Sequence, residues 1–253
     1  MDICPNHDPD AVAQDDGGGC PPDQLSRLSD ELDLLADLVP LADQRIIELG
    51  CGNARLARSL LARHAGSQLV GLEVDAVQHA KNMATPQQRL VFMAGSAEAI
   101  PFPDASFDGA LMLKSLHHVP LDGMDQALVE VARVVKPGGW FYVSEPIFGG
   151  ALNEVVRLYN DENTVRRAAQ AALDRALAAG THWAAAEERR FAQPAHFKDW
   201  AEFEQRMLYP SFADHFITPA LAERVRAAFM PHMTADGAHF VRPMHVRLLR
   251  RKG

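Results

Sequence analysis

Residues 46–55 read IIELGCGNAR, and they are the most informative segment of the chain about its fold. A short apolar run, typical of a buried strand, carries one carboxylate, Glu48, and leads directly into a glycine-rich turn. A helical pattern, ARLARSLLARHA, follows the turn. Because glycine lets the backbone approach a ligand closely, a strand, a glycine turn and a helix in this order predict a ligand-binding loop. Several unrelated cofactors use such loops, so the neighbouring residues have to identify the ligand.

The first half of the chain alternates in the same way. Strands are expected at 45–49, 68–73, 90–93, 107–113 and 140–144, with helical patterns between them. Apolar strands separated by helices indicate an α/β fold, a parallel sheet covered on both faces. Ligands bind such sheets at the carboxyl ends of the strands, near the point where the strand order reverses.

The alternation of strands and helices ends at about residue 146. One or two helices are expected over 151–179, an aromatic-rich stretch over 183–216, a helix over 219–229 and one or two strands within 238–250. We therefore divide the chain into a flexible acidic tail (1–22), a ligand-binding core (23–146), a helical lid or acceptor region (147–235) and C-terminal strands that complete the sheet (236–253). The core begins with a leucine-rich helix, expected over 23–38.

Composition narrows the class of protein. The 253 residues are 47% hydrophobic, enough for one substantial core, and no apolar run approaches the ~18–20 residues of a membrane span. The first residues are acidic, unlike a signal peptide, and three cysteines fit a reducing cytoplasm. Residues 1–44 hold 11 acidic side chains against one basic side chain, so the net charge of −8 belongs to that segment. The nearly neutral remainder argues against a nucleic-acid partner.

The glycine turn itself excludes two common cofactor classes. A dinucleotide fingerprint needs a small residue three places after its second glycine, and Arg55 stands there. No G-K-[ST] follows, so the turn is not a nucleotide-triphosphate loop. Glu48 would repel a pyrophosphate and attract a cation. The turn therefore favours a ligand that carries an ammonium or sulfonium group.

Residues 44–146 resemble the class I S-adenosylmethionine-dependent methyltransferases, particularly the branch that acts on small molecules. Five stretches match in order and spacing: IIELGCGNA, LVGLEVD, GSAEAIPFPDASFD, LMLKSLHHV and RVVKPGGWFYVSEP. The resemblance implies S-adenosylmethionine as the cofactor and a Rossmann-like sheet, mostly parallel and seven-stranded, with helices on both faces. In this chain a helical, aromatic-rich C-terminal insertion would be added to that sheet.

The resemblance also implies which residues bind the cofactor. The predicted set is Glu48, Gly50, Cys51, Gly52, Glu73, Val74, Ser96, Ala97, Glu98, Lys114 and Ser115. Glu73 would accept hydrogen bonds from the two ribose hydroxyls. This chain departs from the family pattern twice. Ala54 replaces a glycine, and Ser96 replaces the aspartate that contacts the adenine amine, which is expected to weaken cofactor affinity without abolishing it.

Methyl transfer from a sulfonium is an in-line displacement, and positioning supplies much of its catalysis. An oxygen or nitrogen acceptor can still need a general base, and His117 and His118 follow the fourth strand where the family holds the methyl group. The alternative for either histidine is a structural role at a helix start. No metal site is expected, because Cys4, His7 and Cys20 lack a second closely spaced pair.

Three functions are compatible with these motifs. The favoured one is methylation of a small molecule at oxygen, nitrogen or carbon, with the aromatic stretch 183–216 as the candidate acceptor pocket. A protein acceptor is the second, since the motifs of nucleic-acid methyltransferases are missing. The third is a non-catalytic protein that binds S-adenosylmethionine or S-adenosylhomocysteine. The helix expected over 23–38 could cover the cleft or pair two copies in a homodimer, and no membrane partner is expected.

Overall fold

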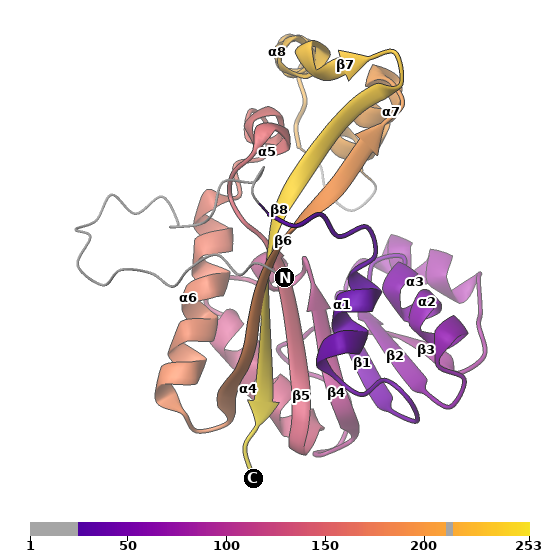
Figure 1. The fold of residues 1–253 in the computed structure, drawn as a ribbon, viewed down its shortest axis with the longest axis vertical. Helices are drawn as coiled ribbons and strands as arrows, with labels where there is room; N and C mark the ends of the chain where they lie inside the picture. The colour runs from indigo at the N-terminus through magenta and orange to yellow at the C-terminus, as the bar shows by residue number, and fades with distance from the viewer. Residues whose placement is uncertain (1–24, 211–214) are drawn as a thin grey trace.

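The computed structural model describes residues 25–210 and 215–253 (Figure 1). The tail expected over 1–22 lies outside the described residues. Five parallel strands form the core of one sheet: β1 (Arg45–Leu49), β2 (Gln68–Glu73), β3 (Leu90–Ala94), β4 (Phe107–Leu113) and β5 (Val135–Pro146). Two long antiparallel strands, β8 (Gly237–Arg251) and β6 (Trp183–Phe197), extend the sheet beyond β5, and the short β7 (Met233–Thr234) pairs with β8.

The strand order β3-β2-β1-β4-β5-β8-β6 reverses direction between β1 and β4. The sheet has eight strands where seven were expected, because two segments of the region expected to be helical, β6 and the short β7, form strands that pair with β8. The single strand β8 occupies the stretch expected to hold one or two strands. The carboxyl ends of β1 and β4 flank the reversal, which is the place where a ligand site is expected.

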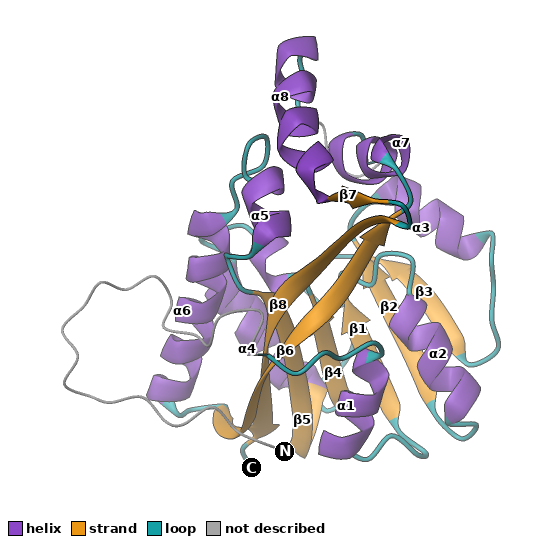
Figure 2. Cartoon of the chain, turned by 45° about the horizontal axis from the view of Figure 1, so that its top comes forward, coloured by secondary structure: helices purple, strands orange, loops and turns teal. Residues whose placement is uncertain are grey.

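Helices cover both faces of the sheet (Figure 2). On one face α4 (Met124–Val134) and α6 (Asn163–Ala179) pack against apolar side chains such as Ile47 and Phe141. On the other face α1 (Glu31–Leu38) and α2 (Arg55–Arg63) pack with Ile46. The helix α3 (Ala76–Met83) connects β2 to β3, and the turn η2 (Leu116–His118) follows β4.

The first helix is shorter than expected. Asp30 caps α1 by accepting a hydrogen bond from the backbone N–H of Leu32. Before this cap the chain is extended and bonds to β6: Leu28 donates to the carbonyl of Ala192, whose own N–H donates to Ser26. These two bonds use backbone groups that a longer helix would have needed.

The far parts of β6 and β8 rise away from the parallel strands and carry a lobe of helices (Figure 1). The lobe consists of α5 (Ala151–Val156), α7 (Trp200–Phe203), the π-helical turn η3 (Glu204–Leu208), α8 (Pro219–Phe229) and the turn η4 (Met230–His232). A separate apolar cluster, with Phe197, Phe203 and Phe229 at its centre, holds these elements together. Across 25–210 and 215–253, no helix has the length and apolar character that crossing a bilayer demands.

Candidate functional site

The glycine turn after β1 has the backbone geometry that its sequence predicts. Gly50 and Gly52 both adopt positive φ, +65° and +52°. A Cβ on Gly50 would lie 2.7 Å from the Cβ of Ser115, whereas a Cβ on Gly52 would meet open space. Ala54, at the position of a family glycine, also has positive φ (54°), a conformation that costs an alanine about 1 kcal/mol. The turn therefore presents bare backbone towards open space at Gly52.

Glu73, at the end of β2, is tied to this turn. Its Oε2 accepts a hydrogen bond from the N–H of Gly52 (2.7 Å), and its Oε1 accepts one from Asp75 (3.0 Å). Each carboxylate oxygen keeps a second lone pair for another donor. The neighbouring Val74 is 70% exposed, so an apolar side chain stands uncovered beside the carboxylate.

The loop after β3 bonds within itself. The hydroxyl of Ser96 donates to Glu98 Oε2 (2.9 Å) and accepts from the N–H of Glu98 (3.1 Å). Ala97, between them, is buried. This loop follows β3, the outermost strand, which pairs with β2. Ser96 therefore lies, like Glu73, at the carboxyl ends of the parallel strands.

A buried polar cluster lies below the turn, on the face that α1 covers. Glu48 is 4% exposed and its Oε2 has no hydrogen-bond partner among the described residues. Burial raises the pKa of Glu48 to about 8, although Lys114 opposes the shift. Lys114 Nζ lies 3.6 Å from Glu31 Oε2, and the hydroxyl of Tyr142 donates to Glu31 Oε1 (3.2 Å). The cluster thus holds two buried carboxyl groups against one lysine.

Cys51 is a buried thiol in the middle of the turn. Its Sγ lies 3.8 Å from the amide nitrogen of Asn82. Burial, with Glu48 and Glu73 close by, raises the pKa of the Cys51 thiol well above its usual range. The thiol therefore stays protonated, and Cys51 fills space instead of acting as a nucleophile.

The exit of β4 is held by a carboxylate from the end of β5. Glu145 Oε1 accepts hydrogen bonds from the backbone N–H groups of Ser115 (3.2 Å) and Leu116 (2.8 Å), and Glu145 Oε2 bonds to His117 Nδ1. The hydroxyl of Ser115 donates to the carbonyl of Leu49, which fastens this exit to β1. Because Glu145 occupies Nδ1, Nε2 is the ring nitrogen of the buried His117 that Glu145 leaves free.

That second nitrogen, Nε2, lies 3.9 Å from Glu162 Oε2, at the start of α6. The centroid of the His118 ring lies 4.1 Å from that of the His117 ring, with the two planes tilted by 42°. Loss of water around its ring, together with His117, lowers the pKa of His118, although the residue as a whole is exposed. Arg166 pairs with Glu162 and, despite partial burial, helps to lower the pKa of that carboxyl.

The predicted residues thus gather along one edge of the sheet, at the ends of β1, β2 and β4 and in the loop after β3. Sequence reasoning missed three carboxylates of this edge: Glu31, Glu145 and Glu162. Glu145 stands in the quoted stretch RVVKPGGWFYVSEP, so its place at a strand end could have indicated it. Glu31 begins α1 and Glu162 directly precedes α6, and no local pattern distinguishes them from surface acids.

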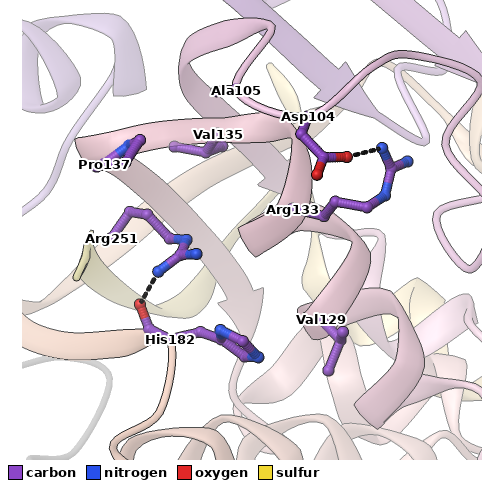
Figure 3. Close-up of a pocket in the computed structure, with 8 residues that line it drawn as sticks. All are labelled: Asp104, Ala105, Val129, Arg133, Val135, Pro137, His182 and Arg251. Atoms are coloured by element: carbon purple, nitrogen blue, oxygen red, sulfur yellow. Dashed lines mark hydrogen bonds and ion pairs between the residues drawn. The ribbon is translucent and has the colours of Figure 1, made fainter. Parts of the chain in front are cut away.

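A surface pocket of about 380 Å³ lies elsewhere, at the opposite edge of the sheet near the start of β5 (Figure 3). Its lining includes Arg133 and Arg251. Arg133 pairs with Asp104 and Glu130, and Arg251 donates to backbone carbonyls that include that of His182. Both guanidinium groups are therefore engaged within the chain, and the predicted site residues lie outside this pocket.

Comparison with known proteins agrees with this geometry. Residues 47–143 match a family model described as "Methyltransferase domain". The chain is 33% identical over 130 residues to the 27-O-demethylrifamycin SV methyltransferase of Amycolatopsis mediterranei, covering 49% of this chain and 46% of that protein. It is also 33% identical over 129 residues to the fatty-acid O-methyltransferase of Mycolicibacterium smegmatis, with 49% and 45% covered. The chain thus spans about half the length of these curated relatives.

Solved structures share the fold across most of the chain. YcgJ from Bacillus subtilis superimposes with a TM-score of 0.61 at 16% identity, covering 88% of this chain and 98% of that one. A structure titled [4+2]-cyclase SpnF has a TM-score of 0.55 at 20% identity, covering 88% and 80%. At these identities the likeness shows the fold alone, and a shared fold does not by itself establish a shared chemistry.

Proposed function

Residues 47–143 form a class I S-adenosylmethionine-dependent methyltransferase domain, and on that premise we propose that this protein transfers a methyl group to a small-molecule acceptor. The observation that carries the proposal is the buried carboxyl of Glu48, which has an unpartnered oxygen beside an open glycine turn. A buried acid without a partner is costly, and a cation brought by a ligand would relieve that cost. S-adenosylmethionine brings two cationic groups, an ammonium and a sulfonium.

The other predicted residues fit the remaining parts of this cofactor. The uncovered side chain of Val74 and the buried Ala97 suit an adenine ring, and Glu73 has lone pairs for two ribose hydroxyls. Ser96 has a lone pair for the adenine amine, though its proton is given to Glu98. When bound, S-adenosylmethionine supplies an electrophilic methyl group on sulfur. The protein's part is to hold the acceptor in line with that group and to exclude water.

An oxygen acceptor is the favoured class. The two relatives named above are both methyltransferases of oxygen, by their names or by the position that the name gives. A hydroxyl has to lose a proton as it is methylated, and His117 and His118 are the candidate proton acceptors at the β4 exit. Glu145 would fix the tautomer of His117 that leaves Nε2 free to accept.

Titration calorimetry with S-adenosylmethionine, S-adenosylhomocysteine and NAD tests the cofactor. We expect binding of the first two and none of NAD. Glu73→Ala should weaken binding of S-adenosylhomocysteine about 10- to 100-fold, because two charge-assisted hydrogen bonds are lost. The matched control is Glu154→Ala, which removes an acid that is 61% exposed on α5. Unchanged affinity in Glu73→Ala, or binding of NAD alone, would refute the assignment. Release of S-adenosylhomocysteine during incubation with a panel of small hydroxylated compounds then tests the transfer.

A further inference from the structure

We propose that His117, His118 and Glu162 bind a divalent transition-metal ion at the exit of β4. Each of the three offers one ligand atom, and these atoms lie within 4.8 Å of one another. Two imidazoles and a carboxylate form a common three-ligand set for Zn²⁺ in catalytic sites, where a fourth position stays open. The inference rests on the proposed function, since it places the ion beside the predicted acceptor.

The groups around the three ligands hold them as the partners of a metal site do. Glu145 bonds to His117 Nδ1, so Nε2 is the nitrogen turned towards Glu162. A carboxylate on the far nitrogen of a ligating histidine fixes the ring and raises its basicity. The carboxylate of Glu162 is itself oriented, by Asn160 on Oε1 (2.9 Å) and by Arg166 on Oε2.

The three ligand atoms need to move only slightly closer together to coordinate one ion. Ligand atoms on a tetrahedral zinc lie about 2.0–2.2 Å from the ion and hence about 3.4 Å from one another. His117 Nε2 and Glu162 Oε2 are already 3.9 Å apart. His118 belongs to an exposed turn position, so its side chain can rotate without disturbing the core.

Charge sets the affinity and the kind of ion. Glu145 and Glu162 are the negative groups, while Arg166 and the half-buried Arg242 are positive neighbours of Glu162. The two carboxylates are balanced by two guanidinium groups, so the site has no excess negative charge to attract the ion. We therefore expect micromolar rather than nanomolar binding. Two nitrogen ligands favour Zn²⁺, Co²⁺ or Ni²⁺ over Mg²⁺, which prefers oxygen.

Such an ion would change the part that the two histidines play. An imidazole lone pair given to the metal cannot accept a proton, so the acceptor hydroxyl would instead bind at the open position and ionise there. Its proton passes to water, its oxygen forms the bond to the methyl carbon, and the S–CH₃ bond breaks with its electron pair returning to sulfur. The proposal thus favours an acceptor whose hydroxyl can reach a metal ion.

Titration of the metal-free protein with ZnCl₂, CoCl₂ and MgCl₂ tests the site, with Co²⁺ absorption as a second readout. We expect Zn²⁺ and Co²⁺ to bind and Mg²⁺ not to. His118→Ala and Glu162→Gln should each weaken Co²⁺ binding at least tenfold, and Glu145→Gln about 10- to 100-fold. Cysteine and histidine side chains elsewhere in the chain can bind zinc without forming a specific site, so the variants decide the result and not stoichiometry alone.

The matched control is His239→Ala. His239 and His196 form a second pair of neighbouring rings, with centroids 4.5 Å apart and planes tilted by 37°, but Nε2 of His196 faces a backbone carbonyl and not a carboxylate. This control should bind Co²⁺ like the wild type. If the wild type does not bind Co²⁺, or if His118→Ala and Glu162→Gln bind it as tightly as the wild type does, the metal site is refuted. S-adenosylhomocysteine affinity is measured on the same metal-free proteins. Variants that still bind it are folded. A wild type that binds Co²⁺ but not S-adenosylhomocysteine would refute the proposed function and leave the metal site standing.

Discussion

Among single residues, the proposed role of Glu48 in cofactor binding predicts that binding depends on pH. With a pKa of about 8, the carboxyl is mostly protonated at neutral pH, and a cationic ligand favours its ionised form. Binding of S-adenosylhomocysteine, which carries an ammonium group, should therefore expel a proton near pH 7. Its affinity should rise by up to about tenfold per pH unit between pH 6 and 8 and then level off.

Calorimetry in buffers of different ionisation enthalpy measures that proton directly. Glu48→Gln keeps the size of the side chain and removes the titration, so its affinity should be flat over this pH range. A wild-type affinity that does not depend on pH would contradict the role given to Glu48.

The same raised pKa also means that the folded state binds this proton more tightly than the unfolded state does. The contribution of Glu48 to the free energy of unfolding therefore falls as pH rises from about 4.5 to 8.

The sequence predicted the backbone part of the site better than its polar contacts. Gly50 and Gly52 follow from a local rule, because only positions with positive φ or close approach demand glycine. Glu145 and Glu162 meet His117 through tertiary packing, across 28 residues in the first case. No spacing in the chain encodes that meeting, so a histidine pair could be proposed from the sequence and its carboxylate partners could not.

Among the secondary-structure elements, β1 follows from its local sequence, whereas β6 depends on tertiary contacts. The strands β1 to β4 are short continuous apolar runs, which burial on both faces requires, and their bounds were predicted to within one residue. β5 was expected over 140–144 but spans Val135–Pro146, because its first residues, VKPGG, do not form an apolar run. β6 contains AAAEERR, which neither alternates nor forms an apolar run, and most of that stretch is exposed. Its strand conformation comes from pairing with β8, from Trp183 opposite Arg251 to Phe197 opposite Ala238. Tertiary pairing here overrides local preference.

The end of β6 anchors the lobe through one aromatic side chain. Phe197 is 2% exposed, and its ring contacts those of Phe203, Phe229 and Phe240. Phe197→Ala should lower the free energy of unfolding by about 3–5 kcal/mol, because it leaves a cavity in a small cluster. Urea unfolding measures this change. Tyr209→Ala, which truncates an aromatic side chain of the same lobe that is 56% exposed, should cost under about 1 kcal/mol. Equal effects would contradict the anchoring role.

At the scale of the whole molecule, the antiparallel extension explains where the lobe stands. β8 pairs with β5 as far as Pro146 opposite Met244, at the carboxyl end of β5, and the remaining residues of β8 continue beyond it with β6. The lobe is therefore carried past the same edge of the sheet that holds the glycine turn and the β4 exit (Figures 1 and 2). A sequence can indicate aromatic helices, but the direction in which a long strand pair projects depends on its register.

This arrangement predicts which amides a cofactor protects. If the cofactor lies along the edge formed by β1, β2 and β3, S-adenosylhomocysteine should slow hydrogen exchange at 50–53, 73–75 and 96–98, three loops distant in sequence. Helix α8, whose cluster is separate from both faces of the sheet, should exchange at an unchanged rate and serves as the internal control. Hydrogen-exchange mass spectrometry measures all four segments in one sample, with NAD as the control ligand. Protection confined to α8, or absent from the three loops, would mean that the cofactor binds elsewhere, because a ligand that buries backbone N–H groups must slow their local opening.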